Sequence, residues 1–114
     1  MTFVLDSRAM SAATALHHPR TEEIRLEGVL HALSDPIRLQ MVRMLAAQDA
    51  PCRCGAIEVP VSKSTRTHHW RVLRENGLIR QVEQGTAKLT ELRHDDLEAR
   101  FPGLLEVVLR PAGT

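Results

Sequence analysis

The sequence predicts a mainly α-helical fold that carries one small β-hairpin. Apolar residues recur at helical spacing in segments between residues 22 and 109, the period changes to an alternating one over residues 78–92, and proline or glycine separates the segments. A chain of 114 residues has the size of one compact domain. Because aromatic residues make up only 3% of it, the core must consist of aliphatic side chains.

The first two helices are predicted from their caps. One runs over about Glu22 to Leu33, where Thr21 can cap and two glutamates suit the positive end of a helix. The second runs from Pro36 to about Ala47, because Asp35 caps well and proline is favoured at the first helical position. This second helix is apolar over much of its circumference, which indicates a central position.

A helix over Ser62 to Gly77 is the most distinctive element. Ser62 or Ser64 can cap its first turn, and Gly77 can take the left-handed conformation that ends a helix. Trp70 and Leu73, with His69 beside them, fall on one face, while Lys63, Arg71 and Arg74 face outward. The preceding stretch, Cys52 to Val59, is long enough for a helix of two turns at most before Pro60.

The remaining residues predict a hairpin and a broken terminal helix. Residues 78–82 and 87–92 alternate in polarity around a turn that contains Gly85. A helix then starts at Asp95 and is interrupted at Pro102-Gly103. Its last piece is too apolar to be left in water, so we expect it to form a twofold dimer together with the first helix.

This order of elements is that of a winged helix-turn-helix domain, with the hairpin as the wing. We expect the domain to span residues 19–110, after a flexible N-terminal arm of residues 1–18 and before a tail of residues 111–114.

Positive charge is concentrated near the predicted wing and its neighbouring helix. The formal net charge of the whole chain is only +1. Between residues 62 and 80, however, Glu75 is the only acid, and the bases are Lys63, Arg66, Arg71, Arg74 and Arg80. A locally basic face on a nearly neutral protein is typical of nucleic-acid binding.

Two stretches resemble the signature regions of the ArsR-type (ArsR/SmtB) bacterial transcriptional repressors: residues 32–39, ALSDPIRL, and residues 62–79, SKSTRTHHWRVLRENGLI. The resemblance covers roughly Glu22 to Leu109. It implies a homodimer that binds an inverted-repeat operator in double-stranded DNA, places its wings over the flanking backbone and is released by an inducer. Three features depart from the family: a shorter helix before the Ser62 helix, Arg66 at a commonly apolar position and Trp70 in place of the common leucine.

The predicted DNA contacts lie in the early turns of the Ser62 helix, because the second helix of a helix-turn-helix reads bases from there. The predicted contact residues are Ser62, Lys63, Ser64, Thr65, Arg66, Thr67 and His68, with Arg71 on the flank and Arg80 and Lys88 on the hairpin for the DNA backbone. Simpler roles are open for some of them: capping for Ser62 and Ser64, and a solvated helix face for Arg71 and Arg74. We expect His69 to be a hydrogen-bonded helix residue near the core.

Cys52 and Cys54 are the only cysteines and leave three interpretations open. They could bind a metal or metalloid ion, form a redox switch, or be inert buried thiols. Several metal-sensing members of the family that the chain resembles carry a cysteine motif in the corresponding helix. Two thiolates do not complete a metal site, so further ligands would have to come from His17 or His18 or from solvent.

Other classes of function are weakly supported. No apolar run approaches the roughly 20 residues that a membrane span needs, and no secretory signal is recognisable, so we expect a cytoplasmic protein without a membrane partner. The sequence has no glycine-rich phosphate loop and no nucleophile and base at catalytic spacing, so we do not expect an enzyme. A winged-helix module that binds proteins but not DNA is the alternative from another class.

Overall fold

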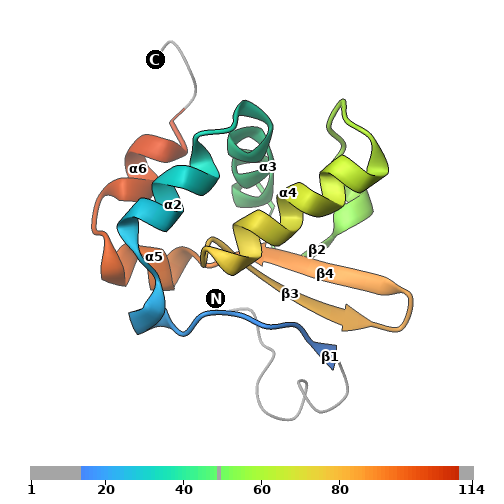
Figure 1. Cartoon of the computed structure of the whole chain (residues 1–114), viewed down its shortest axis with the longest axis horizontal. Coiled ribbons are helices and arrows are strands. Elements are labelled where there is room, and N and C mark those ends of the chain that lie inside the picture. Colours follow the sequence, from blue (N-terminus) through green and yellow to red (C-terminus); the bar gives the residue numbers. More distant parts are fainter. Residues whose placement is uncertain (1–13, 49, 111–114) are drawn as a thin grey trace.

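The computed structural model describes residues 14–48 and 50–110, and it is mainly helical with one antiparallel sheet (Figure 1). The α-helices are α2 (Leu26–Leu33), α3 (Pro36–Ala46), α4 (Lys63–Glu75), α5 (His94–Arg100) and α6 (Leu104–Val108). The strands are β1 (Thr14–Ala15), β2 (Cys52–Arg53), β3 (Ile79–Gln84) and β4 (Ala87–Leu92). The predicted winged helix-turn-helix is confirmed. No helix in the described ranges is long and apolar enough to cross a membrane.

The sheet is built around the predicted hairpin. Its strand order is β1-β3-β4-β2, and every pairing is antiparallel. Gln84 pairs with Ala87, so only Gly85 and Thr86 form the turn, and Gly85 takes a φ of 63° there. A two-residue turn of this kind requires positive φ, which glycine adopts without strain. The wing is thus β3, β4 and this turn.

One hydrophobic core joins all the helices to the wing. Buried aliphatic side chains come from α2, α3, α4, α5 and α6, and from the start of β3. Met41, Val42 and Leu45 of α3 lie in this core, as expected for a central helix. The predicted cap of α3 is also confirmed, since Asp35 Oδ1 accepts hydrogen bonds from the backbone N–H groups of Ile37 (2.8 Å) and Arg38 (3.1 Å).

The first predicted helix is shorter than expected. The structure has a 3-10 turn over Thr21–Glu23, extended backbone at Ile24 and Arg25, and α2 only from Leu26. Thr21 does not cap a helix with its hydroxyl, which donates to Asp96 Oδ1 at 2.9 Å. Ile24 is buried and its carbonyl accepts from Arg100 at 3.2 Å, so long-range contacts outweigh the local helical pattern here.

The expected short helix over residues 52–59 is wrong. Cys52 and Arg53 form β2, which pairs with Thr90 and Leu89 of β4, and a single 3-10 turn follows over Cys54–Ala56. The backbone groups of β2 are satisfied by the wing instead of by a helical turn. Buried Ile57 and Val59 then anchor the connection to α4. The first half of the helix-turn-helix is therefore reduced to one tight turn.

The end of the predicted N-terminal arm joins the sheet. Thr14 and Ala15 pair with Glu83 and Val82 of β3, and His18 Nε2 accepts a hydrogen bond from the Gln81 backbone N–H at 2.9 Å. The arm's residues 1–13 and the predicted tail, residues 111–114, lie outside the described residues. At the other end, Gly103 with a φ of 88° separates α5 from α6, at the predicted break.

Candidate nucleic-acid interface

The α4 helix is held at both ends as its sequence predicts. Ser62 is the cap, and its Oγ accepts from the Thr65 backbone N–H at 3.2 Å. After the last turn, Gly77 has a φ of 85°, and a Cβ atom there would lie 2.6 Å from Ile24 Cγ1. Only glycine fits such a position, because both the backbone angle and the neighbouring side chain exclude a larger residue.

The two faces of α4 differ as expected. His69, Trp70 and Leu73 are buried against the core. The exposed residues at the start of the helix, continuing to Arg71, are Ser62, Lys63, Ser64, Thr65, Thr67, His68 and Arg71, while Arg66 is half-buried. Ser62 Oγ also lies 2.9 Å from Thr65 Oγ1 and 3.3 Å from Ser64 Oγ. Hydroxyl groups therefore cluster at the positive end of a 13-residue helix, where anions bind well.

Arg38 fixes the orientation of α4, a role that the sequence pattern did not reveal. Its guanidinium is buried; Nε donates to the Ala32 carbonyl at 2.7 Å, and Nη1 lies 3.1 Å from His69 Nδ1. Because a guanidinium cannot accept, His69 Nδ1 must be the acceptor. Burial, with a contribution from Arg38, lowers the pKa of His69, so its imidazole is neutral with the proton on Nε2. The end of α2, α3 and α4 are thereby locked together.

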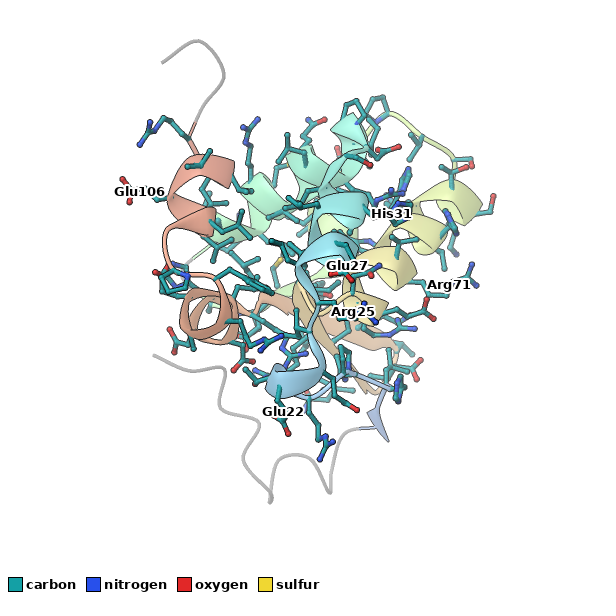
Figure 2. All side chains as sticks on the ribbon, turned by 60° about the vertical axis from the view of Figure 1, so that its left-hand side comes forward. Glu22, Arg25, Glu27, His31, Arg71 and Glu106 are labelled. Carbon is teal, nitrogen blue, oxygen red and sulfur yellow. The ribbon has the colours of Figure 1, made fainter. Side chains whose placement is uncertain are left out.

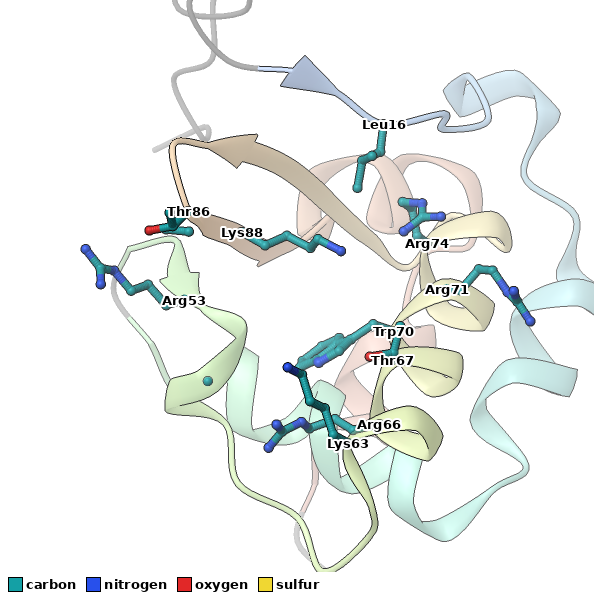
Figure 3. Close-up of a pocket in the computed structure, with 12 residues that line it drawn as sticks. Leu16, Arg53, Lys63, Arg66, Thr67, Trp70, Arg71, Arg74, Thr86 and Lys88 are labelled. Carbon is teal, nitrogen blue, oxygen red and sulfur yellow. The ribbon is translucent and has the colours of Figure 1, made fainter.

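A groove of about 480 Å³ runs between α4 and the wing (Figure 3). Six basic residues and no acidic residue line it: Arg53, Lys63, Arg66, Arg71, Arg74 and Lys88. Leu16, Trp70 and Ala87 supply apolar wall. Lys88 reaches from β4 toward α4, whereas Arg53 and Arg71 extend outward (Figure 3). We call this feature the cationic groove.

Arg74 ties α4 to the wing and is not a freely solvated side chain. It is half-buried, and its Nη1 donates to Gln81 Oε1 at 2.9 Å. Gln81 is fully buried in β3 and donates through Nε2 to Thr90 Oγ1 of β4 at 3.1 Å. Two solvent-shielded donors of groove residues, Arg74 Nε and Trp70 Nε1, have no acceptor within the described part of the chain.

Arg80 lies in a cluster of opposite charges behind the wing. Its guanidinium is 3.2 Å from Asp96 Oδ2 and 3.4 Å from Glu91 Oε1, and buried Arg93 donates to Asp96 Oδ2 at 2.9 Å. We call Arg80, Glu91, Arg93 and Asp96 the ion-pair cluster. This placement favours a structural role for Arg80 over the phosphate contact that its position in the hairpin predicts.

The carboxylates of the ion-pair cluster respond differently to their surroundings. Burial raises the pKa of Glu91 to about 7, and the nearby Arg80 only partly opposes this shift. Burial also works to raise the pKa of Asp96, but hydrogen bonds from Arg93 and Thr21 outweigh it and hold the pKa below its usual value. Asp96 is therefore the permanent anion of the cluster.

The predicted metal or redox pair is only partly described. The Cys52 side chain is half-buried and packs against the hydrophobic core, whereas the Cys54 side chain lies outside the described part of the molecule. Among the described residues, no group of three or more His, Cys, Asp or Glu side chains is placed to hold a metal ion. His18, one of the suggested extra ligands, already uses its Nε2 to accept a hydrogen bond from the Gln81 backbone N–H.

Comparison with known proteins places this geometry in a family. Residues 33–82 match the family model of a helix-turn-helix domain. The chain is 32% identical over 89 residues to the uncharacterized HTH-type transcriptional regulator YceK of Bacillus subtilis, across 76% of this chain and 88% of the relative. It is 31% identical over 74 residues to an arsenical resistance operon repressor of Staphylococcus xylosus, across 64% and 70%. The chain belongs to the ArsR-type helix-turn-helix transcriptional regulators.

Proposed function

We propose that this DNA-binding transcriptional regulator is a repressor that binds an inverted-repeat operator as a homodimer and is released by an inducer. The observation that carries the proposal is the orientation of α4. Its buried face is fixed by the core and by Arg38, so that its hydroxyl and basic residues project from the start of the helix. The start of α4 and the tip of the wing lie at the same end of the molecule (Figure 1).

Within this interface we assign two kinds of contact. Exposed Ser64, Thr65 and His68 would meet base edges in the major groove, as the early residues of recognition helices do. Lys63, Arg66 and Lys88 would neutralise phosphates along the backbone. Thr67 and Arg71 flank the base-reading set, and Ser62 serves first as the cap. We leave Arg80 out of the interface because it belongs to the ion-pair cluster.

The proposed dimer uses α2 and α6. Leu26 and Leu30 of α2 are 43% and 51% exposed, and Val107 of α6 is 66% exposed. Both helices lie away from the tip of the wing, and Figure 2 turns this side forward, with Glu27 labelled on α2 and Glu106 on α6. Large apolar side chains gathered on one side of a small domain are typical of an interface between copies. A dimer through this side would leave both α4 helices open to DNA.

A salt series tests the DNA interface. The full chain is mixed with a fragment of its own upstream region, and retardation is measured between low and physiological salt. Lys63→Ala combined with Arg66→Ala should weaken binding and lower the slope of log affinity against log salt by about 1 for each phosphate contact that is lost. The exposed Arg20, which pairs with Glu22, gives the control Arg20→Ala, which measures the non-specific effect of losing one positive charge.

Unchanged affinity in the double variant would contradict the assignment of α4. If the unaltered protein retards no fragment at any salt concentration, the repressor proposal fails and a winged-helix module that binds proteins becomes the better interpretation. The proposed repressor has no catalytic role, and we place it in the cytoplasm, with the DNA that it would bind.

Sensing by Cys52 and Cys54 stays a prediction. Zinc, arsenite and peroxide should be titrated separately while thiol reactivity and operator binding are followed. A response to zinc or arsenite would favour a metal or metalloid site, and a response to peroxide alone would favour a redox switch. If none of the three alters thiol reactivity or DNA binding, the cysteines are inert.

A further inference from the structure

The cationic groove holds three arginines, Arg53, Arg71 and Arg74, in addition to the three basic side chains assigned above to DNA phosphates. Six basic side chains line it, and none of the six forms an ion pair with a carboxylate in the described part of the chain. Most other arginines are compensated: Arg20, Arg25, Arg80, Arg93 and Arg110 by carboxylates, and Arg38, Arg43 and Arg100 by backbone carbonyls. A cleft lined by one sign of charge concentrates the opposite ion.

The shape of the groove also points to a small ligand. Its volume of about 480 Å³ falls in the range of small-molecule sites, roughly 300–1,000 Å³. Trp70 is almost fully buried at its floor, and Leu16 and Ala87 add apolar wall. A duplex is a wide convex rod, so its phosphates would reach the basic side chains of the groove but not Trp70, which is only 4% exposed.

The groove residues include donors that lack acceptors. Trp70 Nε1 and Arg74 Nε are shielded from solvent without an acceptor among the described residues. Arg74 already uses Nη1 to bind Gln81, so its guanidinium is held at the upper part of the groove with further N–H groups available (Figure 3). Arginine and lysine together are the side chains best suited to phosphate oxygens.

We propose that the cationic groove binds a small molecule that carries more than one phosphate charge. The phosphates would lie between Lys63 and Arg66 on α4 and Lys88 on the wing, and a less polar part would lie against Leu16, Trp70 and Ala87. If the proposed function holds, the free anion and the operator backbone use the same lysines. The ligand would then displace DNA directly.

The protein contains its own reporter for this test. Trp70 is the only tryptophan in the chain and lines the groove, so its fluorescence should change on binding. Pyrophosphate is the probe, titrated into the DNA-free full chain, with sodium chloride at matched ionic strength as reference. We expect a saturable change with pyrophosphate alone. Lys63→Gln and Lys88→Gln should each weaken it by roughly tenfold, as expected for one lost charge-assisted hydrogen bond, and Arg20→Gln should leave it unchanged.

The outcomes separate this proposal from the proposed function. No saturable response to pyrophosphate, or one that both groove variants retain, overturns the small-molecule site. If DNA binding depends on Lys63 and Lys88 while pyrophosphate has no effect beyond ionic strength, the groove holds only the DNA backbone and the proposal is wrong. If pyrophosphate binds as expected but no DNA fragment is retarded, the site stands and the repressor proposal fails. Circular dichroism of each variant verifies the fold.

Discussion

The cationic groove and the ion-pair cluster lie on two sides of the same wing, and they differ in whether their basic side chains have carboxylate partners. In the cluster, Arg80 and Arg93 meet carboxylates within 3.4 Å, and Arg93 is only 5% exposed. In the groove, Lys63, Arg66 and Lys88 have no carboxylate partner among the described residues. Charge that stabilises the fold is neutralised within it, whereas charge left unpaired on a concave surface is available to a ligand.

The largest expected effect comes from breaking the ion-pair cluster. Asp96→Ala removes the acceptor shared by Arg93, Arg80 and Thr21 and leaves Arg93 buried without its carboxylate. Uncompensated buried charge is costly, so we expect the free energy of unfolding to fall by roughly 3 kcal/mol. Urea denaturation followed by circular dichroism measures this. A loss below about 0.5 kcal/mol would mean that the cluster contributes as little as a surface ion pair.

Glu91 gives the cluster a pH dependence. Because its pKa in the folded protein, about 7, is above its ordinary value of 4.5, its contribution to stability is fully present below pH 4.5 and is lost as pH rises through 7. Glu91→Gln imitates the neutral acid. The variant should therefore gain stability over the unaltered protein by roughly 2 kcal/mol between pH 5 and pH 8, an upper figure given partial solvent screening. If the free energies of unfolding of the two proteins differ by a constant amount across this range, the pKa of Glu91 is not raised.

His18 lies close to arginines of both the ion-pair cluster and the cationic groove, and its contribution to stability should change with pH in the opposite direction to that of Glu91. Burial lowers its pKa from 6.5 to about 4, with smaller contributions from Arg93, Arg74 and Arg80. Its contribution to stability is therefore present above pH 6.5 and is lost as pH falls toward 4. Protonation would also remove the acceptor for the Gln81 N–H, so backbone exchange at Gln81 should accelerate. His18→Ala should flatten this part of the pH profile by about 1 kcal/mol, a figure reduced because the ring is only half-buried.

The smallest expected effect on stability lies in the cationic groove. Lys88→Ala removes a charge that has no described carboxylate partner. The free energy of unfolding, measured by thermal denaturation, should therefore change by no more than about 0.5 kcal/mol in either direction. The same variant should weaken binding of the upstream DNA fragment. A large loss of stability would show that Lys88 belongs with the structural charges of the cluster, and the contrast between the two regions would disappear.

The sequence predicted those parts of the fold that short segments determine. Asp35 and Pro36 start α3, Ser62 starts α4 and Gly77 ends it, because capping and positive φ depend on a residue and its near neighbours. Ile24 interrupts the first predicted helix for a different reason: its burial against Gly77 joins residues 53 positions apart in the chain. No local pattern reports such a contact.

The candidate site shows the same division. The exposed start of α4 follows from helical periodicity, and its residues lie where the sequence predicts. Arg80 and Lys88 are equivalent in the sequence, as basic residues of a hairpin, yet one is placed beside Asp96 and the other beside α4. Which acid meets which base is decided by tertiary packing. The link from Arg38 to His69 likewise spans 31 positions and could not be predicted from either residue alone.

The two outer strands of the sheet, β1 and β2, are only two residues each, and they cover parts of both edges of the hairpin. An uncovered strand edge offers its N–H and C=O groups to any other extended chain, whereas very short edge strands limit such pairing. A shortened protein beginning at Pro19 would open the edge of β3 at Val82 and Glu83. Such a protein should form aggregates more readily than the full chain, even if its DNA affinity is retained.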